Sequence, residues 1–533
     1  MLNKLIKKSG VLSARRASLR MLGKIESQVK QQETHFASDT RPVILFVASA
    51  HIKHFGLGAA GGLISSWALR LAGVPVIYFI CQRGLTQCVL GSNRVGVVAP
   101  PPCKDCVDHR NEIYPSQLTH KFAQVSDDTV LRAELNTLPW EELICFTKDG
   151  VEFGKLCLPS LRWVQRRFNL IPDDFTRYML TEYILSSVHL AKEFSALIDQ
   201  TKPQAVISMN GTHFPEAVVR EIALAHGIHA ITFESGLRGD TLFFTNGIAT
   251  EYPIHIPSDF VMGTKENETL DGYLNERSKG EFSIAGRRQW TKMEKLPPQL
   301  HDKTKEYRQI VTVFANTVWD TSQAYANRFF GNMFDWLEKT LHYADLYPDT
   351  LFIVRAHPDE ARPGKVSNES VADWMKNSGY EKRENVFFIA PEVHVNSYEL
   401  IKLAKFCLVY NSTIGMEASM MGKTVLPGGW TRYRNANACL DANSYADYIE
   451  KLESLLEFKG DLPLRPDLVE NARRYYYFSQ FRAVVDISGF IEHLENIEYR
   501  LKPFPLAALD PAYSKDMRVI VDSILQGIEF VFS

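Results

Sequence analysis

The chain has 533 residues, of which 45% are hydrophobic and 23% are charged. This composition is typical of a globular protein long enough for two or more domains. The formal net charge of −2 excludes the strongly basic proteins that bind nucleic acid through their overall charge, so we expect no nucleic-acid partner.

A basic segment precedes the first regular pattern of the chain. Its first 30 residues hold eight Lys or Arg residues and the single acid Glu26. Apolar residues recur among them at roughly helical spacing, which would allow an amphipathic helix on an anionic membrane. A solvated tail explains the same pattern, and we predict a basic N-terminal tail over residues 1–40.

No apolar stretch of the sequence is long enough to cross a membrane. A spanning helix needs roughly 18 to 20 apolar residues, and no uncharged run approaches that length. The N-terminus also lacks the apolar core of a secretory signal. We therefore expect a cytoplasmic protein, with peripheral contact to the inner face of the cell membrane through the basic N-terminus as an open alternative.

An α/β pattern begins at residue 42. Residues 43–49 and 74–80 read as buried strands, and the apolar spacing between them over 62–72 is helical. This is a βαβ unit with a right-handed crossover and a two-sided core. Residues 51–62 read as a glycine-rich loop whose spacing does not match the dinucleotide-binding fingerprint.

Four of the eight cysteines cluster in the sequence: Cys81, Cys88, Cys103 and Cys106. The Cys-x-x-Cys pair with two thiols upstream is one arrangement that holds a structural zinc. Cys81 ends an apolar strand, however, and buried free cysteines are commonly small core residues. We predict no cofactor and keep the zinc site as the alternative.

The first domain is expected to span residues 41–290 and to contain a helical insertion at about 115–200. The strands at 204–211 and 228–234 resume the α/β pattern after this insertion. Polar and charged residues follow both strands, with His213 after the first and Glu234 at the end of the second. A polar stretch at 265–305 reads as the linker to the next domain.

The second domain is expected over residues 305–480, with strands ending near Asn316, His357 and Asn411. A C-terminal helical extension is expected over 481–533, with helices near 484–499 and 516–528. The chain therefore predicts an α/β fold with two parallel-sheet domains, and open sheets of this kind place ligands at the carboxyl ends of their strands.

Two polar clusters of the second domain stand at such strand ends. Asn411, Ser412 and Thr413 lead from a strand into a helix, whose unpaired N–H groups suit a phosphate. Glu417 lies one turn further on the same face, where it can accept hydrogen bonds from ribose hydroxyls. A capping box without any ligand explains these four residues equally well.

Arg355 and His357 form the second cluster, at the end of a neighbouring strand. A guanidinium and an imidazole there can neutralise the same phosphate, and Asn316 ends a third strand of the predicted sheet. A buried Arg–Asp pair or a His-Pro turn is the alternative. Two anion-binding strand ends in one domain favour a site for a nucleotide-sugar or nucleotide phosphate.

Together these segments resemble the bacterial capsular and surface polysaccharide biosynthesis glycosyltransferases. The matching residues are His357-Pro-Asp-Glu360, Tyr410-Asn-Ser-Thr-Ile-Gly-Met-Glu-Ala418, Gly422-Lys-Thr-Val425, Gly428, Gly429 and Tyr433. The resemblance is strongest over 305–435, and only Asn210-Gly211 and Glu234-Ser-Gly236 fit in the first domain. It implies the GT-B architecture, in which two Rossmann-like domains face each other across a cleft.

The resemblance also implies roles for individual residues. His357, Ser412 and Thr413 would contact the donor phosphate, and Glu417 the ribose. The donor would be CMP- or NDP-linked, because His-Pro with Ser-Thr also occurs in transferases for sialic acid or Kdo. Residues 430–433 depart from the Kdo-transferase pattern, which has a glycine-rich loop at this place.

A catalytic base would then lie on the first domain, opposite the donor. Glu234 and His213 are the ionisable candidates there, and we favour Glu234. We find no Asp-x-Asp motif after a strand, so the site residues include no metal ligand and we expect a metal-independent mechanism.

The predicted function is transfer of a sugar from a nucleotide-sugar donor to a surface (capsular or lipo-) polysaccharide or glycolipid acceptor. Three alternatives stay open. A non-hydrolysing sugar-nucleotide epimerase and a polyol-phosphate transferase would use a similar fold and phosphate site. A non-catalytic component of a polysaccharide export complex would keep the fold without turnover.

Overall fold

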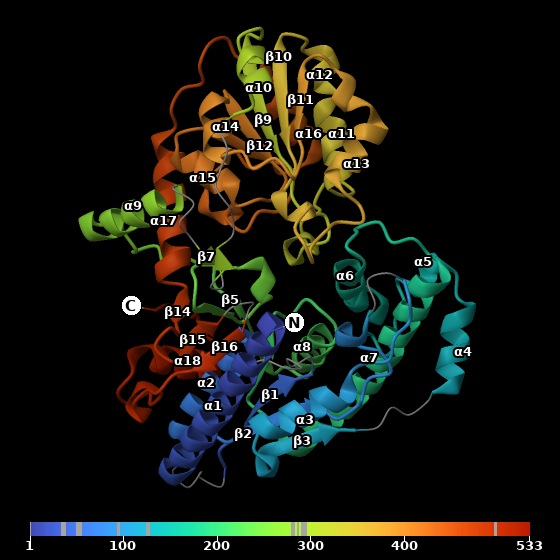
Figure 1. Cartoon of the computed structure of the whole chain (residues 1–533), viewed down its shortest axis with the longest axis vertical. Helices are drawn as coiled ribbons and strands as arrows, with labels where there is room; N and C mark the ends of the chain where they lie inside the picture. Colours follow the sequence, from blue (N-terminus) through green and yellow to red (C-terminus); the bar gives the residue numbers. More distant parts are fainter. Residues whose placement is uncertain are drawn as a thin grey trace.

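The computed structural model shows two α/β domains, each built around its own sheet (Figure 1). It describes residues 2–33, 39–48, 56–92, 96–123, 128–278, 283–284, 287–288, 296–494 and 498–532. No helix within these ranges is long and apolar enough to cross a membrane.

The first sheet has seven strands in the order β14-β6-β5-β4-β1-β2-β3. Neighbours from β3 to β5 are parallel, and β6 and β14 pair antiparallel. The order reverses between β1 and β4, which makes that position the switch point of the sheet. The strands are β1 (Val43–Val47), β2 (Val76–Cys81), β3 (Thr119–Phe122), β4 (Ala205–Met209), β5 (His229–Ser235), β6 (Thr241–Thr245) and β14 (Val484–Asp486).

Helices cover both faces of the first sheet. Alternation along β1 sends Val43 and Leu45 to one core and Ile44 and Phe46 to the other. The first core includes α1 (Leu2–Gln32), α2 (Leu57–Leu71), α3 (Cys103–Ile113) and α18 (Lys515–Gln526). The second includes α4 (Thr129–Thr137), α5 (Trp140–Leu143), α6 (Phe153–Gln165), α7 (Asp174–Thr201) and α8 (Glu216–Ala225).

The second sheet is fully parallel, in the order β11-β10-β9-β12-β13. Its strands are β9 (Gln309–Phe314), β10 (Thr350–Arg355), β11 (Val386–Ile389), β12 (Phe406–Val409) and β13 (Thr424–Pro427). One core holds α11 (Met333–Leu341), α12 (Tyr343–Leu346), α13 (Val371–Ser378) and α16 (Tyr445–Glu457), and the other holds α9 (Thr264–Ser278), α10 (Pro298–Lys303), α14 (Ser397–Leu403), α15 (Ile414–Met420) and α17 (Pro466–Phe481).

Both sheets share the 3-2-1-4-5 order of Rossmann-like domains, and their carboxyl edges turn toward each other (Figure 1). This confirms the predicted α/β class with two Rossmann-like domains and a helical insertion in the first. Helix α17 runs from the second domain back to the first and leads into β14, so the end of the chain completes the first sheet.

Three expectations about local structure are wrong. The stretch 265–305 is not a linker, because α9 and α10 bury Leu270 and Leu300 in the second domain. The region 484–499 is not helical: it forms β14 and the hairpin of β15 (Ile491–Leu494) with β16 (Glu498–Leu501). Residues 57–62 begin α2 rather than forming a loop, while 49–55 lie outside the described residues.

Two further segments differ from the sequence prediction. Strand β3 is an edge strand of the first sheet, although it falls within the predicted helical insertion. The N-terminal segment is a helix rather than a tail. Leu22, Ile25 and Val29 of α1 are buried in the first domain, so this apolar stripe packs on protein instead of facing a membrane.

Contacts between the domains fix their relative position. The Arg166 guanidinium carbon lies 4.4 Å from the ring centroid of Trp163 in the first domain and 3.9 Å from that of Trp319 in the second. The Glu369 carboxylate accepts hydrogen bonds from the backbone N–H groups of Phe168 (2.8 Å) and Asn169 (2.9 Å). These contacts join the end of α6 to the loop before α13.

Ion pairs to Arg70 of α2 should hold α1 in place. Arg70 is 1% exposed and donates to Glu26 and Glu33 of the N-terminal segment, each at 2.7 Å. Replacing both glutamates with alanine leaves a buried guanidinium without a counterion, which we expect to cost about 3 kcal/mol of stability. Calorimetric unfolding measures this loss.

Arg70→Leu is the matched control for this prediction. The two carboxylates it leaves are 18% and 16% exposed, so water can solvate them and the loss should be smaller. A larger loss for Arg70→Leu than for the double variant would contradict the explanation.

Candidate functional site

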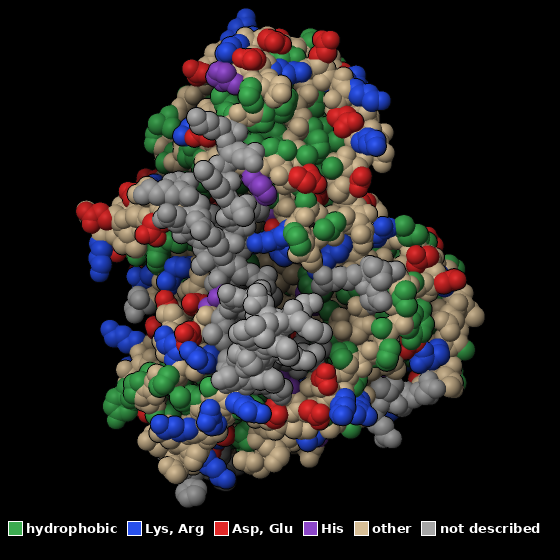
Figure 2. Space-filling view, in the orientation of Figure 1, with side chains coloured by type: hydrophobic (Ala, Val, Ile, Leu, Met, Phe, Trp, Pro, Cys, Tyr) green, Lys and Arg blue, Asp and Glu red, His purple; other side chains and the backbone are tan. Residues whose placement is uncertain are grey.

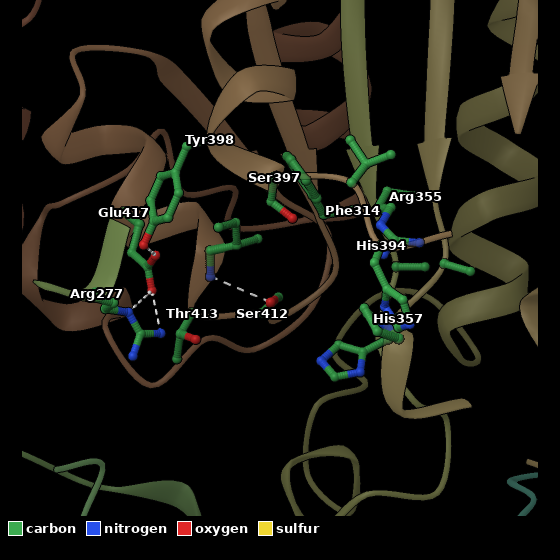
Figure 3. Close-up of a pocket in the computed structure, with 15 residues that line it drawn as sticks. Arg277, Phe314, Arg355, His357, His394, Ser397, Tyr398, Ser412, Thr413 and Glu417 are labelled. Carbon is green, nitrogen blue, oxygen red and sulfur yellow. Dashed lines mark hydrogen bonds and ion pairs between the residues drawn. The ribbon is translucent and has the colours of Figure 1, made fainter. Parts of the chain in front are cut away.

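A cavity opens at the carboxyl edge of the second sheet, beside its switch point between β9 and β12 (Figure 3). Parallel strands end together at this edge, so segments distant in sequence meet there. The cavity is lined by Arg277, Phe314, Ala315, Arg355, Ala356, His357, Pro358, His394, Val395, Ser397, Tyr398, Ser412, Thr413, Ile414 and Glu417. Five of the seven residues predicted to bind a donor therefore share one cavity.

Arg355 and His357 line the cavity at the end of β10. Arg355 Nη1 donates to the Ala390 carbonyl at 2.7 Å, and burial lowers the pKa of its guanidinium to about 10, so it stays cationic at neutral pH. Burial also lowers the pKa of His357 below its usual value, although the Asp359 carboxylate opposes this shift. The His357 imidazole is therefore neutral at neutral pH.

The tautomer of His357 is set by its own turn. The backbone N–H of Asp359 donates to His357 Nδ1 at 3.1 Å, which places the ring proton on Nε2. His357 can therefore donate a hydrogen bond to an anion without carrying a charge itself. With a neutral imidazole, Arg355 supplies the positive charge of the pair, and neutralisation of a phosphate by both groups stays a prediction.

Ser412 and Thr413 form the turn from β12 into α15, across the cavity from His357 (Figure 3). The Tyr433 hydroxyl donates to the Ser412 carbonyl at 2.8 Å, which fixes the turn. Ser412 Oγ accepts a bond of 3.4 Å from the N–H of Ile414. The hydroxyls of Ser412 and Thr413 thus reach the same space as the His357 ring.

Glu417 lies one helical turn further and is tied to two other elements (Figure 3). Its Oε1 accepts from Arg277 Nη2 at 2.8 Å, and its Oε2 accepts from the Tyr398 hydroxyl at 2.5 Å. The carboxylate is 4% exposed, and the Arg277 side chain is 14% exposed. Oε1 also accepts from Arg277 Nε at 3.2 Å, so the second lone pair of Oε2 is the one that can accept a hydrogen bond from a ligand.

Asn316 and Asn411 lie behind the cavity and do not line it. Asn316 Nδ2 donates to Asn411 Oδ1 at 2.8 Å, and Gln323 Nε2 donates to the same oxygen at 2.7 Å. Asn411 Nδ2 in turn donates to the Ser322 carbonyl at 2.9 Å. Both asparagines therefore brace the loop after β9 against the end of β12.

Glu234 ends β5 at the carboxyl edge of the first sheet and faces the second domain. It is half-buried, and its Oε1 accepts from the Ser235 N–H at 2.8 Å. Burial raises the pKa of Glu234, and the negative charge of Asp320 in the second domain raises it further. Asp320 also acts on the pKa of His357, so this carboxylate connects Glu234 electrostatically to the donor cavity.

His213 occupies a different environment from Glu234. Its ring packs edge-on against Trp163, with centroids 6.0 Å apart, and its Nδ1 lies 3.4 Å from Ser160 Oγ. Burial lowers the pKa of His213 to about 4, so the imidazole is a weak base at neutral pH. Burial thus lowers the basicity of His213 and raises that of Glu234, which favours Glu234 as the base.

Sequence reasoning missed four residues of this site: Arg277, His394, Tyr398 and Asp320. His394 follows β11, so the rule that flagged polar strand ends elsewhere would also have found it. Arg277 carried no such signal, because it lies in the stretch read as a linker.

No group of three or more His, Cys, Asp or Glu side chains in the described ranges could hold a metal ion. Cys103 and Cys106 lie in the first two turns of α3, and Cys81 accepts a bond from the Gly84 N–H at 3.4 Å. The zinc alternative thus gains no support and stays a prediction.

The chain was compared with families, curated proteins and solved structures. No family model and no curated protein matches it. Among solved structures it is similar to KpsC of Thermosulfurimonas dismutans, a beta Kdo 2,4 transferase, with 15% identity and a TM-score of 0.33 over 52% of this chain and 80% of that one.

UDP-GlcNAc 2-epimerases are also among the similar structures. The Methanocaldococcus jannaschii enzyme in complex with UDP-GlcNAc and UDP has 11% identity and a TM-score of 0.26, over 82% of this chain and 98% of that one. MnaA of S. aureus, solved with UDP, has 12% identity and a TM-score of 0.26, over 83% and 94%. With TM-scores this low, the fold is assigned from the strand orders of this chain itself.

The Arg277–Glu417 pair generates a prediction about nucleotide binding. Arg277→Met leaves the Glu417 carboxylate held only by Tyr398, so its orientation toward the cavity is lost. We expect the nucleotide that stabilises the wild type in a thermal-shift series of CMP, UDP and GDP to bind about tenfold more weakly.

Arg473→Met is the matched control for this variant. Arg473 of α17 donates to Asp271 of α9 at 2.8 Å, so its loss loosens the same helix without reaching Glu417. If both variants weaken nucleotide binding equally, α9 contributes to binding only through the stability of the domain.

Proposed function

We propose that this protein transfers a sugar from a nucleotide-sugar donor to a surface polysaccharide or lipid-linked acceptor. The observation that carries the proposal is the convergence of Arg355, His357 and Ser412 with Glu417 in one cavity at the sheet's switch point. This set pairs anion-binding groups with a carboxylate that can hold ribose hydroxyls, as a nucleotide-sugar requires.

In the proposed reaction, Glu234 accepts the proton of an acceptor hydroxyl. The acceptor oxygen then forms a bond to the anomeric carbon, and the bond from that carbon to the nucleotide's phosphate oxygen breaks. Negative charge develops on the leaving phosphate, where Arg355, His357 and the Ser412 hydroxyl can stabilise it. These groups need no metal ion for this role, and both CMP- and NDP-linked donors fit the scheme.

A sugar-nucleotide epimerase is the second candidate, and Asp320 is the observation that favours it. Asp320 and Glu234 belong to different domains and interact electrostatically, so two carboxylates reach the space in front of the donor cavity. An epimerase would use two such groups to remove and return a proton at a sugar carbon. Product analysis separates the two candidates, since only a transferase needs an acceptor.

We also propose that the N-terminal helix contacts an anionic membrane, where a lipid-linked acceptor would be found. Arg16, Arg20 and Lys24 repeat every four residues along α1 and are exposed. Figure 2 shows Lys and Arg side chains on the surface where α1 lies. Because the apolar stripe of α1 packs on the first domain, the basic face stays exposed and can contact anionic lipid electrostatically. Vesicle sedimentation with and without anionic lipid tests the proposal.

His357→Ala should abolish transfer and weaken nucleotide binding while leaving the fold intact. The variant removes a hydrogen-bond donor to the phosphate from the cavity wall. A panel of radiolabelled sugar nucleotides, followed for transfer and for donor hydrolysis, measures the effect. His342→Ala, an exposed histidine after α11, is the control, and unchanged turnover in His357→Ala would overturn the donor-site assignment.

Turnover should fall at acid pH as Glu234 takes up a proton. The pKa of Glu234 is raised, so the base form is lost at a higher pH than for an ordinary glutamate. Glu234→Gln should lower kcat with donor affinity nearly unchanged. Asp320→Asn removes the neighbouring negative charge and should move the acid limb of the kcat/KM profile to lower pH. If the acid limb does not move, a group other than Glu234 is responsible for it.

A further inference from the structure

The segment 428–433 follows β13 and lies beside the donor cavity. Its backbone is held at three points: Gly428 N–H donates to the Val409 carbonyl at 2.8 Å, Gly429 N–H to Tyr410 at 2.7 Å, and Trp430 N–H to Ala326 at 2.7 Å. A Cβ at Gly429 would lie 3.0 Å from the Ala326 carbonyl oxygen, so this close approach favours glycine. The segment is therefore fixed in place, and its Tyr433 hydroxyl donates to the carbonyl of Ser412, which lines the cavity.

Two side-chain atoms of this segment are buried without hydrogen-bond partners in the described structure: Thr431 Oγ1 and Arg432 Nη1. Thr431 is 1% exposed, while Arg432 remains partly exposed. A buried polar atom without a hydrogen-bond partner destabilises the protein, most of all when it is charged. Two such atoms in a segment that is held in place indicate that a ligand supplies their hydrogen-bond partner.

Arg432 is held toward the first domain. Its guanidinium carbon lies 4.2 Å from the ring centroid of Tyr252, and the Tyr475 hydroxyl donates to the Arg432 carbonyl at 2.7 Å. The Tyr252 hydroxyl donates to the Ser235 carbonyl at 2.5 Å, next to Glu234. Stacking on Tyr252 thus orients Arg432 between the donor cavity and the carboxyl edge of the first sheet.

We propose that Arg432, with Thr431, binds an oxyanion of the substrate in the space between the two domains. The group is either a carboxylate on the sugar or a phosphate of donor or acceptor, and an arginine fork recognises both. The inference rests on the proposed function for the identity of the substrate. The anion site itself is inferred from the unpaired atoms of Thr431 and Arg432 and does not depend on that function.

Saturation-transfer NMR on the full chain tests the site with small probes. Methyl phosphate represents the phosphate, D-glucuronate the sugar carboxylate, and D-glucose is the neutral match of glucuronate. We expect one of the anions to bind the wild type at millimolar concentration and to bind Arg432→Gln about tenfold more weakly. Arg434→Gln is the control, because Arg434 Nη2 already donates to the Ala442 carbonyl at 2.6 Å.

Each outcome decides the question. Preferential loss of methyl phosphate assigns a phosphate, and preferential loss of glucuronate assigns a carboxylate. Equal binding by wild type and Arg432→Gln, no anion binding by the wild type, or the same loss in Arg434→Gln overturns the proposal. Thermal unfolding of each variant shows that the fold is kept. The readout needs no turnover, so a failed transfer assay with intact anion binding would overturn the proposed function alone.

Discussion

The parallel pairing of β9 with β12 is the constraint on which the rest of the site depends. Register brings Phe314 opposite Val409, so both strands end at the same level and their following loops diverge around one cavity. The polar residues after β10 and β11 come to the same edge because those strands continue the parallel order. Burial of the strands on both faces fixes this register.

Charge is distributed unevenly within that cavity. Burial keeps His357 neutral, so Arg355 provides the permanent charge on its wall. On the opposite wall, Glu417 is matched by Arg277 and by the hydroxyl of Tyr398. A buried carboxylate without these partners would take up a proton or destabilise the domain. These two partners therefore hold the Glu417 carboxylate in one orientation, which an acceptor of ligand hydrogen bonds needs.

Residues of both domains approach the same region because the carboxyl edges of the two sheets face each other. Glu234 comes from the first sheet, and Asp320 and Arg432 come from the second. Helix α17 and the stacking of Arg166 on Trp319 keep these edges opposed. The proposed donor site, base and anion site therefore lie on different sides of the interface between the two domains.

Hydrophobic periodicity by itself determined strands β1, β2, β4, β5 and β9 to β12. The polar strand ends at His357, Ser412 and Glu234 came with them, because these signals are local. Tertiary structure alone decided what no local pattern encodes. Arg277 reaches Glu417 across 140 residues of sequence, and the strand pairing of β14 with β6 turned an apparent helix into a sheet edge. Both the Arg277–Glu417 ion pair and the β14–β6 pairing depend on which side chains and strand edges are still unpaired once the sheets have formed. The sequence of a single segment does not specify which other segment it will contact.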